Sequence, residues 1–190
     1  MKNLDKQISK WVYDRAHVSP VLTLLAKFGA TYAIGLMVLV AMLFLWQSSY
    51  ASANPMDSIQ PFLTTIGLSW VITLALQFIV RRRRPFECAI YEAKVKMFCK
   101  TPSFPSAHAT ITFATASYFF NHFLFGYFDR AFLFAAIFFF LVAIWVALSR
   151  VAVGVHYVSD ILVGALIGLL TPWLFVLLLV LSCTFTTNCI

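Results

Sequence analysis

Long apolar stretches separated by short polar segments dominate this chain of 190 residues. Five stretches approach or exceed the roughly 20 apolar residues that a helix needs to cross a ~30 Å hydrocarbon core. They cover residues 20–46, 58–80, 104–127, 131–149 and 154–181. The pattern predicts an all-α integral membrane protein, a bundle of about five transmembrane helices within residues 20–181. Because no linker or repeat divides the chain, we expect a single domain over residues 1–190.

The start of the chain has a different pattern. Residues 3–18 are too short and too polar to span a membrane. Apolar residues recur there near helical spacing, at Leu4, Ile8, Trp11, Val12 and Val18. This spacing is typical of an amphipathic helix that lies on the membrane surface. We therefore expect residues 1–19 to form an interfacial helix that precedes the bundle.

Composition supports the membrane interpretation. The chain is 62% hydrophobic and 11% charged, with a mean hydropathy of +0.88, whereas soluble domains carry roughly 25% charged residues. Its net charge of +7 indicates contact with anionic lipid headgroups or an anionic substrate. The basic residues do not form an exposed soluble face, so we expect no nucleic acid partner. The sequence does not indicate an oligomeric state.

Five spans would sort the polar segments onto two faces of the membrane. The start of the chain, segment 81–104 and the turn at 149–154 fall on one face. The loops at 47–57 and 126–130 and the C-terminal tail fall on the other. Nearly all Lys and Arg residues belong to the first face, and Arg130 alone belongs to the second. Three polar clusters also lie on this basic face.

The first cluster is QFIVRRRRPFE, residues 77–87. Gln77, Arg81 and Arg84 are spaced by four and three residues, so they would share one helix face. Pro85 disfavours helical geometry at the preceding residue, which predicts a helix end at Arg84. That position would direct Arg84 into whatever the next loop encloses. The alternative is a run of arginines that binds lipid phosphates at the end of a span.

The second cluster is SFPSAHA, residues 103–109. We expect Pro105 in the first turn of a helix, where its missing N–H costs nothing. The N–H groups of Ser106, Ala107 and His108 would then be unpaired and, with the helix dipole, would bind an anion. His108 would be able to give a proton to an atom held there. The alternative is ordinary helix capping beside an interfacial histidine.

The third cluster is SRVAVGVHYVSD, residues 149–160. Arg150 and His156 flank a turn around Gly154, and His156 and Asp160 share a helix face at i and i+4. An Asp that accepts one imidazole N–H leaves the lone pair of the other nitrogen free. That arrangement suits a general base, a nucleophile or a metal ligand. The alternative is a polar pair that stabilises a helix terminus.

Together the clusters would place arginines, two histidines, one aspartate and a helix N-terminus in one pocket. Guanidinium groups and N-terminal amides match the oxygens of a tetrahedral oxyanion. In phosphoryl transfer one histidine can attack phosphorus while the other protonates the leaving oxygen. Mg²⁺ prefers several carboxylates, and the arginines would repel a cation. We therefore expect no metal and no cofactor.

These clusters resemble the three signature motifs of the type-2 phosphatidic acid phosphatase superfamily of membrane lipid phosphatases. The matching segments are RRRRPF, SFPSAH and SRVAVGVHYVSD. The resemblance implies that His156 forms a phosphohistidine, that Asp160 orients it and that His108 is the general acid. It also implies a metal-free reaction on a lipid phosphate or pyrophosphate substrate. The residues that would hold the phosphate are Arg84, Arg150, Ser106, the backbone around Ala107 and Ser149, which opens the third motif.

The first motif departs from the family pattern, because Gln77 stands at the position of a lysine. We expect Arg81, one helical turn further on, to supply the missing charge. The motif sequences are also similar to those of bacterial undecaprenyl pyrophosphate phosphatases, which makes undecaprenyl pyrophosphate the first choice of substrate. Phosphatidic acid and phosphatidylglycerol phosphate are alternatives. A non-catalytic membrane protein that binds anionic lipids is an alternative of another class.

Two cues disagree about the side of the membrane. The excess of Lys and Arg predicts that the basic face is cytoplasmic, whereas the resemblance implies a site that faces away from the cytoplasm. The spacing of Cys88 and Cys99 permits a disulfide, which would require an oxidising compartment, and equally permits two unpaired thiols. We expect a bacterial inner membrane protein with its site toward the periplasm or outer face.

Overall fold

The computed structural model describes residues 2–48, 56–88, 90–95, 101–125 and 129–187. In these residues the chain forms seven α-helices and a short 3₁₀ helix, with no strand. The elements are α1 (Lys2–Ala16), α2 (Pro20–Thr31), α3 (Ala33–Ser48), α4 (Met56–Val80), η2 (Phe86–Cys88), α5 (Ala107–Phe125), α6 (Arg130–Ala152) and α7 (Val158–Thr187). The predicted all-α class is confirmed.

The first apolar stretch, 20–46, is two helices rather than one. Ser19 caps α2, since its Oγ accepts a hydrogen bond from the N–H of Val21 at 3.3 Å. The chain then bends by 56° between α2 and α3. The two halves bury their small or apolar residues against different partners, because α2 packs mainly on α6 whereas α3 also packs on α5. The predicted span over residues 20–46 is therefore a bent pair of helices that is long enough to cross a membrane only when both halves are taken together.

Length and composition qualify α4, α6 and α7 to cross a membrane, and the bent pair of α2 and α3 would be a fourth span. These three or four spans are counted among the described residues alone. Helix α5 does not qualify, since His108, Asn121 and His122 make its sequence less apolar, as do the buried hydroxyl residues Thr110, Thr112, Thr115 and Ser117. The count of five spans stays a prediction.

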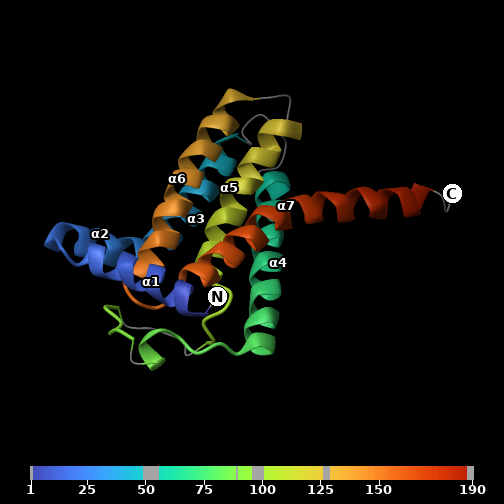
Figure 1. The fold of residues 1–190 in the computed structure, drawn as a ribbon. Helices are drawn as coiled ribbons and strands as arrows, with labels where there is room; N and C mark the ends of the chain where they lie inside the picture. Colours follow the sequence, from blue (N-terminus) through green and yellow to red (C-terminus); the bar gives the residue numbers. More distant parts are fainter. Residues whose placement is uncertain (1, 49–55, 89, 96–100, 126–128, 188–190) are drawn as a thin grey trace.

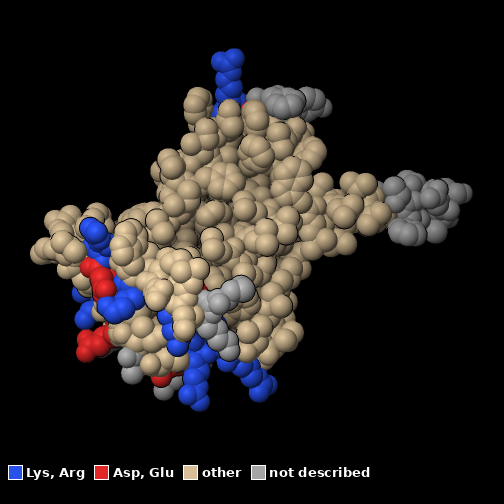
Figure 2. All heavy atoms as spheres, viewed as in Figure 1, with Lys and Arg blue, Asp and Glu red and all other residues tan. Residues whose placement is uncertain are grey.

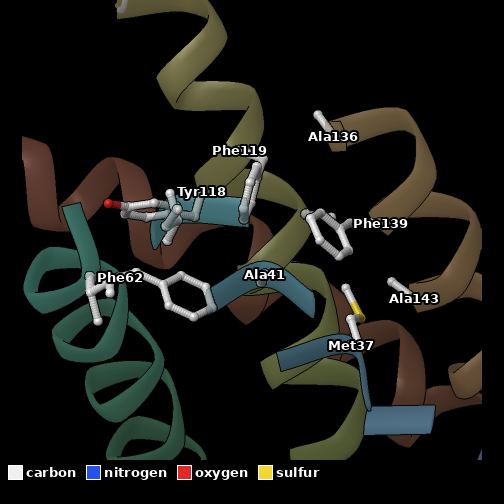
Figure 3. Packing of buried hydrophobic residues seen from close by; sticks show 11 residues of the cluster. Met37, Ala41, Phe62, Tyr118, Phe119, Ala136, Phe139 and Ala143 are labelled. Atoms are coloured by element: carbon white, nitrogen blue, oxygen red, sulfur yellow. The ribbon is translucent and has the colours of Figure 1, made fainter. Parts of the chain in front are cut away.

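Helix α5 is the centre of the bundle and packs against α3, α4, α6 and α7. Aromatic side chains fill the core where these helices meet (Figure 3). The rings of Phe62 and Tyr118 meet edge to face at 5.3 Å between centroids. The rings of Phe119 and Phe139 lie 4.6 Å apart. Such pairs stabilise a core beyond the area that they bury.

Two glycines let α7 approach the backbone of α5. A Cβ atom on Gly164 would lie 2.6 Å from the carbonyl oxygen of Ser106, and one on Gly168 would lie 2.8 Å from the backbone nitrogen of Ala114. Small residues four apart are a common means of close helix packing in membranes. The close contact also joins the start of α5 to α7, because the N–H of Ser106 donates to the carbonyl oxygen of Asp160 at 3.0 Å.

One end of the bundle gathers the polar clusters. Helices α4 and α6 end there and helices α5 and α7 begin there (Figure 1). Lys and Arg side chains crowd the same end (Figure 2). Arg130 begins α6 at the opposite end. This arrangement is the one that the five-span assignment predicts for the three motifs.

Candidate active site

The end of α4 differs from the prediction. The helix ends at Val80 and not at Arg84, and Arg81 adopts a left-handed backbone conformation with φ of 49°. The Arg81 side chain is exposed, and its Nε donates to the carbonyl oxygen of Phe78 at 2.9 Å. Arg81 therefore does not continue the helix face of Gln77, and the structure does not bring it to the other candidate residues.

Arg84 is buried at the centre of the cluster. Its Nε donates to the carbonyl oxygen of Thr101 at 2.9 Å, and its Nη1 donates to the carbonyl oxygen of Val155 at 3.0 Å. Nη1 also lies 3.2 Å from Nε2 of His156. Burial lowers the pKa of Arg84, while the negative charges of Glu87 and Asp160 act in the opposite sense. The guanidinium thus ties the segment after α4 to the turn before α7.

The hydrogen bonds of His156 define its tautomer. A guanidinium can only donate, so Nε2 of His156 accepts from Arg84 and Nδ1 carries the proton. Nδ1 lies 2.9 Å from the carbonyl oxygen of Ser103 and 3.5 Å from Oδ2 of Asp160. The nearest acceptor of the ring N–H is therefore Ser103 and not Asp160 as we expected. The lone pair of Nε2 faces the arginine side of the cluster.

Asp160 is completely buried and every neighbour that binds its carboxylate is a donor. Oδ1 accepts from Nη1 of Arg82 at 2.7 Å. Oδ2 accepts from the hydroxyl of Ser103 and from the N–H of Tyr157 at 2.9 Å. A buried carboxylate needs such compensation, because an unpaired charge in the interior is costly.

Arg150 and His108 stand at the ends of two further helices. Arg150 is buried in the last turn of α6, and its Nη1 donates to the carbonyl oxygen of Ala30 at 2.7 Å. Its Nε–H has no hydrogen-bond partner. His108 lies in the first turn of α5, within electrostatic range of Arg84, Arg150 and His156. Burial and, after it, the charges of Arg150 and Arg84 lower the pKa of His156, which favours its neutral imidazole.

The start of α5 partly matches the predicted anion seat. Pro105 precedes the helix, which begins at Ala107, so Pro105 is not in its first turn. The N–H of Ser106 is already paired with Asp160, which corrects the expectation that it is unpaired. The Ser106 hydroxyl, however, is buried without a partner. The helical hydrogen bonds begin at Thr110, so the amides of Ala107 and His108 have no acceptor within the helix.

Gln77 and Ser149 hold neighbouring elements in place. The side-chain amide of Gln77 donates to the carbonyl oxygen of Pro105 at 2.8 Å, and its own oxygen is buried without a partner. Ser149 faces α2, where its side chain occupies the space that a Cβ on Gly29 would need. The roles of these two residues in phosphate binding stay predictions.

Two expectations concern cysteines and metals. Cys88 is exposed at the end of η2, whereas Cys99 lies outside the described residues, so the predicted alternatives for this pair stay open. In the described part of the chain, no group of three or more His, Cys, Asp or Glu side chains is arranged to hold a metal ion.

Sequence reasoning missed several residues that contact the cluster. Ser103 lay inside the quoted second motif, and Arg82 lay inside the quoted arginine run. Only the side-chain hydrogen bonds in the structure show that they bind Asp160. Asp5 and Ser9 lie on α1, about 150 residues before their partners at the start of α7. Their spacing of four residues places them on one helix face, but nothing in the sequence indicates what that face contacts.

The fold and the cluster define a class of protein. Apolar helices long enough to cross a membrane carry, at one end, buried arginines, two histidines and a helix N-terminus with unpaired donors. Such a site in an integral membrane protein is suited to bind and transfer a phosphoryl group.

Comparison with known families identifies the class further. A family model described as the PAP2 superfamily matches residues 59–182. The chain therefore belongs to the PAP2 superfamily, and the predictions of an integral membrane protein and of a phosphatase are confirmed. No curated protein sequence matches the chain.

Solved structures have a similar fold. A transmembrane PAP2-type phosphatidylglycerolphosphate phosphatase from Bacillus subtilis superimposes with a TM-score of 0.65 at 24% identity, covering 92% of this chain and 83% of that one. LpxE from Aquifex aeolicus superimposes with a TM-score of 0.64 at 21% identity, covering 90% of this chain and 93% of that one. At these identities the similarity establishes the fold alone.

Proposed function

We propose that this protein hydrolyses a lipid pyrophosphate or lipid phosphate through a phosphohistidine intermediate on His156. The first choice of substrate is undecaprenyl pyrophosphate, which would yield undecaprenyl phosphate. One observation carries the proposal: two buried donors, the hydroxyl of Ser106 and the Nε–H of Arg150, have no partner. Buried donors are normally paired, so a ligand with several acceptor oxygens would complete this site.

In this proposal the phosphoryl oxygens bind to these two donors and to the start of α5. Ser106, Arg150 and the first amides of α5 would each donate to an oxygen of the transferred group. Arg84 would exchange its bond to Nε2 of His156 for one to the substrate. This exchange frees the lone pair of Nε2 at the moment when a phosphorus atom is held beside it.

The reaction would then proceed in two displacements. Nε2 of His156 attacks phosphorus and the P–O bond to the lipid phosphate or alcohol breaks. His108, which the negative charge of the bound phosphate would hold in its protonated form, gives a proton to the leaving oxygen. Nδ1–H stays on the Ser103 carbonyl, and the nearby Asp160 carboxylate stabilises the positive charge of the phosphorylated ring. His108 next takes a proton from water, which attacks phosphorus, breaks the P–N bond and releases phosphate.

The choice among lipids rests on the resemblance of the motifs. The Bacillus subtilis relative carries the description of a phosphatidylglycerolphosphate phosphatase, which supports that lipid as the second candidate, beside phosphatidic acid. The polar cluster at one end of a membrane bundle suits any of these headgroups, because the acyl or prenyl chain would remain in the bilayer.

A panel of lipid phosphates and pyrophosphates, assayed in detergent with no added metal and with chelator, tests the function. We expect phosphate release by the unchanged protein and at least a 1000-fold loss in His156→Ala, because the nucleophile is removed. His122→Ala is the matched control, since His122 lies near the other end of α5. Lipid binding without phosphate release by any member of the panel would favour the non-catalytic alternative.

We further propose that the protein resides in a bacterial inner membrane with this site toward the periplasm or outer face. The resemblance of the motifs supports this orientation. The basic segment after α4 also has a reason to be basic that is unrelated to topology, because Arg82 and Arg84 are engaged with site residues.

A further inference from the structure

The amphipathic helix α1 is attached to the first turn of α7. The Ser9 hydroxyl accepts a hydrogen bond from the N–H of Val158 at 3.0 Å. Oδ1 of Asp5 accepts one from the N–H of Ser159 at 3.1 Å. The first N–H groups of a helix have no partner within it, so two side chains from α1 cap α7 from outside.

The same Asp5 carboxylate also reaches Arg82. Oδ2 of Asp5 accepts from Nη2 of Arg82 at 2.7 Å and from the Ser159 hydroxyl at 2.6 Å. Nη1 of Arg82 donates to Oδ1 of Asp160 at 2.7 Å. One planar guanidinium therefore bridges two carboxylates, one on the surface helix and one beside the ring of His156.

We propose that Asp5 is a positioning residue that acts through Arg82 to hold Asp160 beside His156. This inference rests on the proposed function, since it assigns a role in the reaction of the same site. Asp5 does not contact His156 or the unpaired donors of the phosphate site. We assign its effect on the site to the Asp5–Arg82–Asp160 bridge, whereas its bonds to Ser159, together with Ser9, dock the same face of α1.

The geometry explains why Arg82 needs Asp5. The Arg82 side chain is 27% exposed whereas Asp160 is fully buried. An arginine at the surface keeps many rotamers, and a single ion pair barely offsets the entropy of fixing it. A second carboxylate on Nη2 and the ring of Tyr157, 4.0 Å from the guanidinium carbon, hold the group in one orientation.

Loss of Asp5 would release one end of the bridge. Arg82 would be free to turn toward water or lipid phosphates, and the buried Asp160 would lose a fixed counter-charge. Ser103 binds both Asp160 and His156, so a shift of the carboxylate would move the imidazole. A misplacement of about 1 Å can cost about 100-fold in rate.

Asp5→Asn and Asp14→Asn form a matched pair of variants. Both remove one negative charge from α1, but Asp14 is exposed and pairs with Lys10 on the same helix. We expect Asp5→Asn to lower kcat by about 10- to 100-fold and to leave KM within about twofold, since the phosphate donors are untouched. Asp14→Asn should match the unchanged protein in both constants. Equal kcat values for the two variants would overturn the proposal.

A double-mutant cycle tests the route through Arg82. Arg82→Gln should lower kcat at least as far as Asp5→Asn does, and the double variant should be no slower than Arg82→Gln alone. Losses of kcat that multiply in the double variant would show that Asp5 acts independently of Arg82 and would overturn the proposed route.

Ser9→Ala covers the case in which Asp5→Asn does not fold. It removes a neutral acceptor at the same docking point, and we expect a two- to fivefold loss of kcat with unchanged KM. If Asp5→Asn does not fold, an unchanged kcat in Ser9→Ala overturns the inference. Failure of the proposed function would look different, because the unchanged protein would then release no phosphate from any lipid of the panel.

Discussion

The contribution of Asp5 to the stability of the folded state should depend on pH. Burial raises the pKa of Asp5, but hydrogen bonds from Ser159 and Arg82 outweigh burial and bring the pKa below its ordinary value of 3.8. The ionised carboxylate therefore stabilises the folded state at every pH above 3.8. That contribution is lost as the pH falls through the lower pKa of the folded state.

The measurement is the difference in unfolding temperature between the unchanged protein and Asp5→Asn. We expect a constant difference between about pH 5 and pH 8 and a decrease below about pH 4. Arg82 faces the carboxylate from the segment after α4 and Asp160 lies beyond it. A difference that grows on acidification would mean that Asp5 is bound as a neutral acid.

Arg84 gives a second prediction at this scale. Its fork of donors reaches Thr101, Val155 and His156 from one side chain, which a lysine ammonium cannot do. We expect Arg84→Lys to lower kcat/KM by about 100-fold or more, measured as phosphate release from the best lipid of the panel. Arg83→Lys is the control, since Arg83 is the exposed neighbour and its change should cost less than twofold.

The contrast between Arg82 and Arg81 shows how far single residues can be predicted. The sequence indicated that His108, Arg150, His156 and Asp160 belong together, because their spacing is specific and apolar segments surround them. It did not indicate which arginine of four would bind Asp160. That choice depends on the left-handed turn at Arg81, and a periodicity argument assumes that the helix continues through this residue.

At the scale of elements, the close contact of α5 and α7 makes a prediction about glycines. Gly168→Ala would place a Cβ against the backbone of Thr110 and Ala114, which cannot move aside. We expect a loss of about 1–3 kcal/mol of stability, seen as a lower unfolding temperature in detergent. Gly67→Ala in α4, where nothing lies within 4 Å, should be neutral or stabilising because alanine favours helix.

The pattern of apolar residues predicted the positions of the helices but not how they pack. Apolar periodicity located the helices, and α4, α6 and α7 match their predicted spans to within a few residues. It did not predict the bend at Tyr32 or the end of α4, because both depend on which partner each turn packs against. The sequence GALIG at 164–168 was the available sign that α7 lies close to another helix.

At the scale of the whole molecule, one end of the bundle carries nearly all the charge while the sides are apolar. Exposed large side chains cover the outer faces of α6 and α7, among them Phe138, Leu141, Leu166 and Leu170. Such an exterior is stable in lipid and would aggregate in water. Helix α1 sits at the polar end with Leu4, Ile8 and Trp11 exposed on one face and Asp5 and Ser9 turned toward α7.

This division of α1 predicts that membrane contact supports the active site. Trp11 and Leu4 lie on the exposed apolar face of the helix, where they would enter the headgroup region. We expect Trp11→Ser to lower activity in liposomes by about two- to tenfold, because weaker seating of α1 loosens Asp5. Lys10→Ala, on the polar face of α1, should change the activity by less than twofold. Equal activities of the two variants in liposomes would show that contact of α1 with the membrane does not affect catalysis, and would contradict this prediction.

The orientation of the molecule can be read from a single exposed thiol. Cys88 is exposed beside the active-site end, and Arg130 begins α6 at the opposite end. With Cys99, Cys183 and Cys189 replaced by serine, an impermeant maleimide should label Cys88 in intact spheroplasts of an expressing bacterium.

The control places a thiol at the opposite end. In a variant that also carries Cys88→Ser, a thiol introduced by Arg130→Cys should react only after the membrane is permeabilised. The positive-inside rule predicts the reverse, and the excess of Lys and Arg on this face persists when Arg82, Arg84 and Arg150, whose charges are held inside the site, are not counted. If Arg130→Cys is labelled in intact spheroplasts, and Cys88 of the other variant is not, the phosphate site faces the cytoplasm and the proposed orientation is contradicted.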